Sequence, residues 1–91
     1  MAIMITHHRV KDYSTWRPIY DADAARRRSA GIKDWRVAHN PADPNDIYMI
    51  WEVADPSKVQ GMLNDPGLKQ QMDKAGVISA PEAVLVLQEG T

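Results

Sequence analysis

The chain has 91 residues, with 11 Lys and Arg, 12 Asp and Glu and no cysteine, so its formal net charge is −1. This length predicts one domain over residues 1–91, and the lack of cysteine excludes disulfides, zinc ribbons, iron–sulfur clusters and a cysteine nucleophile. The charge balance argues against nucleic acid as a partner. No apolar run approaches the ~18 residues of a membrane span and no signal peptide is evident, so we expect a cytoplasmic protein without a membrane partner.

Four strands are expected from alternation and turn signals, over residues 2–10, 32–39, 47–53 and 83–88. In the first, third and fourth of these, both alternating sets of side chains contain apolar residues. A strand with this pattern is covered on both faces.

The first helical region is interrupted by a proline. Asp12 is suited to cap it, but the ring of Pro18 would clash with a backbone carbonyl one turn earlier. We therefore expect a loose turn over residues 13–17 and a regular helix from Pro18, which Gly31 ends.

The second helical region follows the third strand and is expected in two segments. Asp55 and Asp65 each precede a proline, and this pair is typical of a helix start. The break between the segments is expected near Asn64, and Gly76 closes the second one. Residues 40–45, which contain two prolines and several Asn and Asp residues, predict a turn between the second and third strands.

The order βαββαβ predicts an α+β, ferredoxin-like fold with a four-stranded antiparallel sheet and helices on one face. The other face of the sheet is also apolar, and an exposed apolar face of this size is an association surface. We expect a second copy of the chain to cover it, which gives a homodimeric barrel around an apolar pocket.

Several motifs resemble those of one known group. They lie between residues 3 and 88 and include His8-x-Val10-x-Asp12-Tyr13-x-x-Trp16, Tyr20-Asp21, Arg27-x-x-x-Gly31-Ile32 and Leu68-x-x-x-Met72-x-x-Ala75-Gly76-Val77. With them the chain resembles the antibiotic-biosynthesis-monooxygenase-like dimeric α+β barrel proteins. The resemblance implies the fold and the dimer. It does not fix the reaction, because the wider group includes cofactor-free monooxygenases, haem-degrading oxygenases, isomerases, cyclases and stress-induced barrels.

The candidate catalytic residues are His8 and His39, since a pocket histidine can act as a general base near neutral pH. His8 is the one that matches the resembled pattern, and His7 faces the opposite side of its strand. The alternative is a hydrogen-bonded or solvated histidine near a strand end. No carboxylate joins these histidines to form a metal site, and the axial helical histidine that haem degradation would require by resemblance is missing, so we expect no metal and no cofactor.

The candidate substrate-binding residues are aromatic: Trp35, Tyr48, Trp51 and Tyr20. Such rings on a sheet face are able to hold a flat, apolar ligand. The alternative is that they fill the core of the dimer. Trp35 is expected to share a strand face with His39.

The only basic cluster, Arg26-Arg27-Arg28, is expected to be the solvated face of a helix. Arg27 is six residues from Asp21, which places the two on different helix faces. We expect Arg27 to form a structural ion pair with a strand-end carboxylate or with the rim of the domain.

Two functions remain open. One is a protein that binds an apolar or aromatic metabolite and acts as a cofactor-independent monooxygenase, isomerase or cyclase. The other is a non-catalytic dimeric binding or stress-related module. A cavity of ~300 Å³ or more with a histidine in its wall would favour the first or a ligand carrier.

Overall fold

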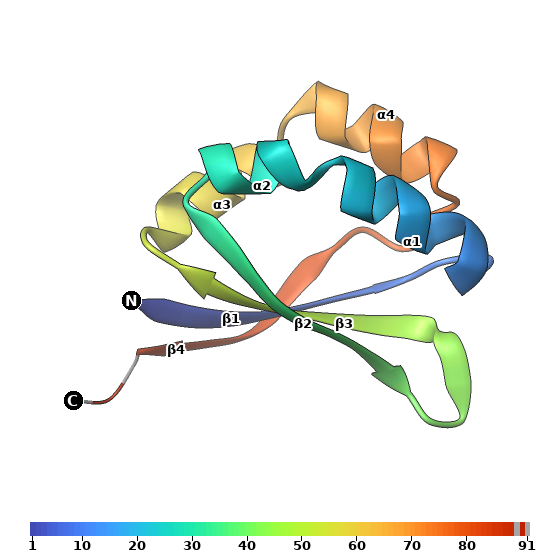
Figure 1. The fold of residues 1–91 in the computed structure, drawn as a ribbon, viewed down its shortest axis with the longest axis horizontal. Coiled ribbons are helices and arrows are strands. Elements are labelled where there is room, and N and C mark those ends of the chain that lie inside the picture. Colours follow the sequence, from blue (N-terminus) through green and yellow to red (C-terminus); the bar gives the residue numbers. More distant parts are fainter. Residues whose placement is uncertain (89, 91) are drawn as a thin grey trace.

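The computed structural model describes residues 1–88 and residue 90. This part of the chain contains four strands and four helices, with one pair of helices after the first strand and another pair after the third (Figure 1). Their bounds are β1 Ala2–Arg9, α1 Tyr13–Ala22, α2 Ala24–Ser29, β2 Ile32–Asn40, β3 Asp43–Val53, α3 Pro56–Leu63, α4 Pro66–Lys74 and β4 Glu82–Gln88.

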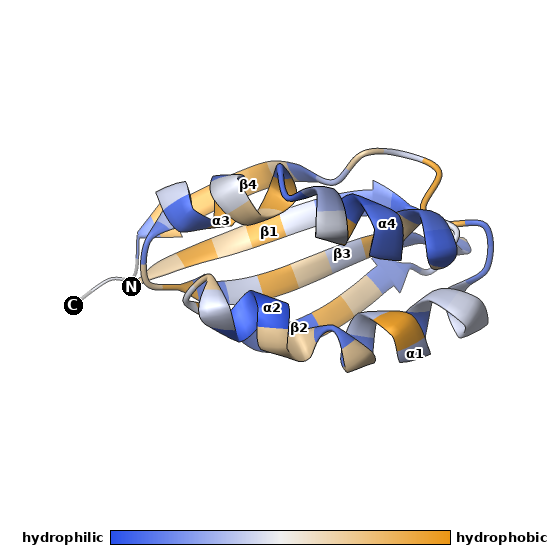
Figure 2. Cartoon of the chain, turned by 90° about the horizontal axis from the view of Figure 1, so that it is seen from above, coloured by the Kyte–Doolittle hydropathy of each residue, from blue (hydrophilic) through white to orange (hydrophobic). Residues whose placement is uncertain are grey.

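The strands form an antiparallel sheet in the order β2-β3-β1-β4. The helices lie on one face of this sheet, with α1 and α2 in one row and α3 and α4 in a second row (Figures 1 and 2). This is the ferredoxin-like arrangement predicted from the sequence, with each helical crossover built from two short helices.

The alternation of β1 decides which of its side chains meet the helices. Every second residue is buried, and antiparallel pairing sets each one beside a buried residue of β3, because directly paired residues point to the same face. The four pairs are Ala2–Val53, Met4–Trp51, Thr6–Met49 and His8–Ile47. They form the floor of the hydrophobic core, and each fully buried large apolar side chain stabilises the fold by ~1.5–3 kcal/mol.

The first helical region differs from the expectation at Pro18. α1 begins earlier, at Tyr13, and Asp12 caps it by accepting a hydrogen bond from a first-turn backbone N–H at 3.1 Å. The helix continues through Pro18 and breaks at Asp23. The burial of Trp16 in the core keeps the first turn helical, and this outweighs the hydrogen bond that the proline removes.

The connection between β2 and β3 is shorter than the predicted turn over residues 40–45. Only Pro41 and Ala42 separate the two strands. The side chain of Asn40 accepts a hydrogen bond from the backbone N–H of Ala42 at 2.9 Å. This local bond closes the hairpin within a few residues. As a result, Pro44 lies inside β3, as the second residue after the turn.

The register of β2 shifts at Trp35. Asp34 pairs with Trp51 and Arg36 pairs with Ile50, which leaves Trp35 as the extra residue of a β-bulge. Its side chain is 56 % exposed. The prediction that Trp35 shares a strand face with His39 is therefore wrong, because the bulge breaks the period of two.

The second helical region is built as predicted. Asp55 and Asp65 cap α3 and α4 by accepting hydrogen bonds from backbone N–H groups at 3.0 and 2.8 Å, and a proline follows each cap. Asn64 ends α3 at the predicted break. α3 buries Val59 and Met62, whereas α4 contains no fully buried residue.

One part of the sheet face opposite the helices is apolar, as predicted. It carries side chains of β1 and β3 and the exposed leucines of β4, namely Ile3, Ile5, Ile50, Leu85 and Leu87. Figure 2 shows apolar segments along β1 and β4. None of the helices in the described part of the chain has the length and apolar character needed to span a bilayer.

Candidate functional site

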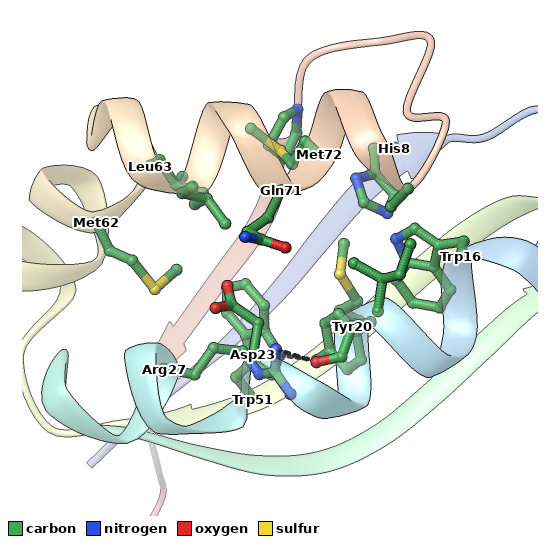
Figure 3. Close-up of a pocket in the computed structure, with 15 residues that line it drawn as sticks. His8, Trp16, Tyr20, Asp23, Arg27, Trp51, Met62, Leu63, Gln71 and Met72 are labelled. Carbon is green, nitrogen blue, oxygen red and sulfur yellow. Dashed lines mark hydrogen bonds between the residues drawn. The ribbon is translucent and has the colours of Figure 1, made fainter.

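A cavity of about 50 Å³ lies between the helices and the sheet (Figure 3). Apolar and aromatic side chains from both layers form most of its walls, among them Trp16, Tyr20, Trp51 and Met62. The sequence predicted an apolar pocket enclosed by the sheets of two copies. This cavity is a different one, inside a single chain, because the face of the sheet that carries Trp51 is the one the helices cover.

His8 forms part of the cavity wall and is only 3 % exposed. Neither of its ring nitrogens has a hydrogen-bond partner among the described residues, and the hydroxyl of Thr6, two residues earlier on the same face, has none either. A buried polar group left in this state costs ~1–3 kcal/mol. Such groups are rare in folded proteins and require an explanation.

Burial lowers the pKa of His8 from 6.5 to about 4, and the electrostatic effect of the neighbouring His7 acts in the same direction. The imidazole of His8 is therefore neutral at neutral pH. In this form one ring nitrogen donates a hydrogen bond and the other accepts one. The cavity thus combines apolar walls with one hydrogen-bond donor and one hydrogen-bond acceptor.

A row of planar groups forms one side of the cavity (Figure 3). The ring of His8 meets Trp16 edge-on at 5.4 Å, and Trp16 stacks on Tyr20 at 4.6 Å between centroids. The guanidinium of Arg27 lies 3.6 Å from the centre of the Tyr20 ring. Offset aromatic contacts and a cation over a ring each add to simple burial, so the row is a rigid wall.

Hydrogen bonds fix the far end of this row. The indole of Trp51 donates to the hydroxyl of Tyr20 at 2.9 Å, and that hydroxyl donates to Asp34 at 3.1 Å. Burial raises the pKa of Tyr20 far above its usual value, so the hydroxyl keeps its proton and remains a donor. Tyr20 and Trp51, two of the predicted binding residues, are thereby held together at the cavity.

Arg27 connects the row to β2. Its Nε–H is shared between the two carboxylate oxygens of Asp34, and its Nη2 donates to the same carboxylate, at 2.9–3.1 Å. Its Nη1 donates to the carbonyl of Tyr20 at 2.8 Å. The predicted structural ion pair of Arg27 is confirmed. The prediction that the whole arginine cluster is solvated is wrong for this residue, which is 5 % exposed.

We expect Arg27→Lys to destabilise the protein by ~1–3 kcal/mol, because an ammonium group cannot form the forked contact with Asp34 or stack on Tyr20. The free energy of unfolding in urea measures this change. Arg28→Lys, on the exposed neighbouring residue, is the matched control and should change the stability by less than ~0.5 kcal/mol. Equal stability of the two variants would show that the buried guanidinium contributes no more than a surface charge.

His39 does not reach the cavity. It pairs with Ile47, and so does His8 from the other side, which places one whole strand between the two histidines. Two strand spacings amount to ~9–10 Å. His39 is exposed, its Nδ1 lies 2.9 Å from the carbonyl oxygen of Asn40, and the two histidines do not form a joint site.

Trp35 and Tyr48 also lie away from the cavity. Trp35 is the exposed bulge residue of β2. Tyr48 points to the open face of the sheet, where its ring lies 4.7 Å from that of His7. The prediction that His7 and His8 face opposite sides is confirmed.

A polar cluster surrounds His7 on the open face. Its Nε2 contacts the buried carboxylate of Asp46, and its Nδ1 lies 3.6 Å from Glu82. The hydrogen bond with His7 lowers the pKa of Asp46. Within residues 1–88 and 90, no three histidine or carboxylate side chains have a geometry suited to a metal ion.

Trp16, Arg27 and Met72 line the cavity but were not predicted as site residues. Trp16 and Tyr20 are four residues apart on one helix, so their side chains form a stripe on one helix face. That spacing was the available signal, because a stripe that packs under a helix also lines any space left between helix and sheet. The sequence singled out Arg27 for an ion pair, but no signal placed it at a cavity.

Comparison with known proteins gives a match of the fold. No protein-family model matches the chain, and no curated protein matches its sequence. Solved structures do match. One is an antibiotic biosynthesis monooxygenase, with a TM-score of 0.68 and 12 % sequence identity, and all of both chains is covered.

Two further structures match almost as completely. The cofactor-independent oxygenase SnoaB from Streptomyces nogalater has a TM-score of 0.68 and 13 % identity, with 99 % of this chain and 93 % of that one covered. A NIPSNAP domain protein from Burkholderia xenovorans has a TM-score of 0.67 and 11 % identity, with 99 % and 95 % covered. At these identities the likeness is one of fold. The resemblance seen in the sequence is thus confirmed at the level of structure: the chain has the fold of the antibiotic biosynthesis monooxygenases.

Proposed function

We propose that the chain binds an apolar, aromatic small molecule that carries a hydroxyl or carbonyl group, with His8 as the hydrogen-bond partner of that group. One observation carries the proposal: a buried imidazole whose two nitrogens have no partner among the described residues stands in the wall of an apolar cavity. A ligand group that bonds to His8 relieves the ~1–3 kcal/mol cost of that burial.

A catalytic role is the second candidate, and the shared fold with a cofactor-independent oxygenase supports it. A neutral His8 would accept the proton of a phenol, and the electron-rich phenolate would react with dioxygen, while isomerase or cyclase chemistry would begin with the same proton transfer. A phenol has a pKa of ~10, so transfer to a base whose pKa is about 4 is uphill by ~8 kcal/mol. This gap favours binding over catalysis unless the substrate is a much stronger acid than phenol.

A thermal-shift screen against aromatic and polyketide-like metabolites tests the binding proposal. A ligand at ~100 times its Kd stabilises the native state by ~2.7 kcal/mol and raises the Tm. His8→Leu should abolish the shift, and His39→Leu, outside the cavity, should leave it intact. A shift that survives in the His8 variant contradicts the assignment.

Oxygen consumption with the same ligands separates the two candidates. Turnover that falls by ~100-fold or more in His8→Ala supports the oxygenase. Binding without oxygen consumption or isomerised product supports the non-catalytic binding module.

We also propose that a second copy of the chain covers the open face of the sheet. The support is the run of exposed apolar side chains on β4, where residues 84–87 are each 45–52 % exposed. Leu85 pairs with Ile5 and continues the apolar open face, while Val86 pairs with Met4 and lies on the helix side of the edge strand.

Leu85→Asp should therefore convert the dimer to a monomer, because it places a charge in the middle of the apolar contact. Sedimentation velocity at micromolar concentration measures the change. Val86→Asp, one residue along the same strand, is the control and should remain dimeric. A wild-type protein that sediments as a monomer would contradict the pairing.

A further inference from the structure

The inner cavity is small compared with the ligand proposed for it. Its volume is about 50 Å³, whereas pockets that hold drug-sized molecules measure ~300–1,000 Å³. One water needs ~10–15 Å³ on the same scale, so the cavity has room for a few water-sized groups. An aromatic ligand would fit only in part.

A second and larger hollow adjoins it. This α4 cleft, of about 610 Å³, lies between the α3–α4 region and the chain that leads into β4. Leu63, Met72 and Pro81 line both the cavity and the α4 cleft, so these three side chains form the boundary between them. Figure 3 shows Leu63 and Met72 at the cavity.

The two walls of the α4 cleft differ in how firmly they are held. The chain after α4 is tied to the end of β1, since Ile78 N–H donates to the carbonyl of Arg9 at 2.8 Å and Lys11 N–H donates to that of Gly76 at 2.9 Å. The opposite wall is α4, which has no fully buried residue. Met72, on this wall, is half-buried and flexible, and an unbranched thioether adapts readily to a new neighbour.

The lining of the α4 cleft suits a neutral ligand with an apolar body. Apolar side chains on both walls contribute surface, such as Met72 on α4 and Ile78 on the chain that follows it. The charged residues at the rim are of both signs, with Lys69 between acidic neighbours, so the cleft has no strong preference for an anion or a cation.

We infer that the ligand is elongated, with its body in the α4 cleft and only its hydroxyl- or carbonyl-bearing end passing between Met72 and Pro81 to His8. This inference rests on the proposed function, because it uses the bond to His8 as the anchor. It assigns the larger part of the binding surface to residues outside the cavity.

Two phenols that share the anchoring group test the inference. 4-Methylphenol offers the polar end alone, and 4-benzylphenol adds a second ring for the α4 cleft. Titration calorimetry should give a Kd for 4-benzylphenol at least ~10-fold lower, because each buried methylene-sized group contributes appreciably to binding. Equal affinities for the two phenols overturn the inference.

Variants test whether the α4 cleft is the source of the higher affinity for 4-benzylphenol. Ala80→Trp fills the α4 cleft from an exposed position and should remove the advantage of 4-benzylphenol while leaving 4-methylphenol unchanged. Ala25→Trp, on the exposed side of α2, is the matched control, and Ile78→Ala is a milder change of the cleft that should weaken only the longer phenol. Unchanged binding of 4-benzylphenol in both cleft variants overturns the inference alone. Binding of neither phenol overturns the proposed function and the inference with it.

Discussion

Lowering the pH should lower the free energy of unfolding by about 3 kcal/mol through His8 alone, since its pKa falls from 6.5 to about 4 on folding and each unit is worth ~1.4 kcal/mol. Below pH 6.5 the unfolded chain binds a proton at this residue, and the native protein does so only near pH 4. Protons therefore favour the unfolded state in this window. The contribution of His8 to stability is fully present above pH 6.5 and is lost as the pH falls to about 4.

Urea unfolding at a series of pH values between ~7 and ~4.5 measures this loss. His8→Leu is the control that isolates it, because the leucine removes the titrating group and the buried polar atoms together. The variant should lack the His8 part of the pH dependence. It should also exceed the wild type in stability at neutral pH by ~1–3 kcal/mol, since the two buried ring nitrogens without a partner are removed. An identical pH profile in both proteins would contradict the burial of His8.

Replacing Trp16 with alanine should cost ~3–5 kcal/mol, which is a large part of the total stability of a domain of this size. Trp16 is 2 % exposed and contacts His8, Tyr13 and Tyr20. Its removal leaves a cavity beneath α1 that the stacked row cannot fill without moving. Thermal and urea unfolding both measure the effect.

Trp35→Ala is the matched control for that substitution, because it removes the same side chain from an exposed position. Its effect should stay within ~0.5 kcal/mol. A cost for Trp35→Ala equal to that of Trp16→Ala would mean that the exposed indole is covered in solution, and sedimentation would then show whether a second copy covers it.

The order of the elements was predictable because local signals were strong and agreed with one another. Asp55 and Asp65, each with a following proline, marked the two helices of the second crossover, and both caps form in the structure. The prediction of a loose turn before Pro18 was wrong because of a tertiary contact. The burial of Trp16 supports a helical turn that local propensity alone disfavours.

The site was predictable only in part. His8, Tyr20 and Trp51 meet at the cavity, but alternation cannot say which apolar face of a two-faced strand the helices will cover. The β-bulge in β2 has no sequence signature, so the exposed position of Trp35 could not be predicted. The unpartnered nitrogens of His8 are a property of its surroundings and not of its position in the sequence.

The two outer strands of the sheet differ in a way that bears on aggregation. β2 presents the bulge at Trp35 together with the charged side chains of Lys33 and Arg36, and such features discourage further strands from adding to an edge. β4 is apolar along residues 84–87 and has no such protection. Growth of an open filament needs two compatible edges, and this sheet offers one. For the pairing proposed above, a single unprotected edge favours a closed, two-fold assembly over a fibre.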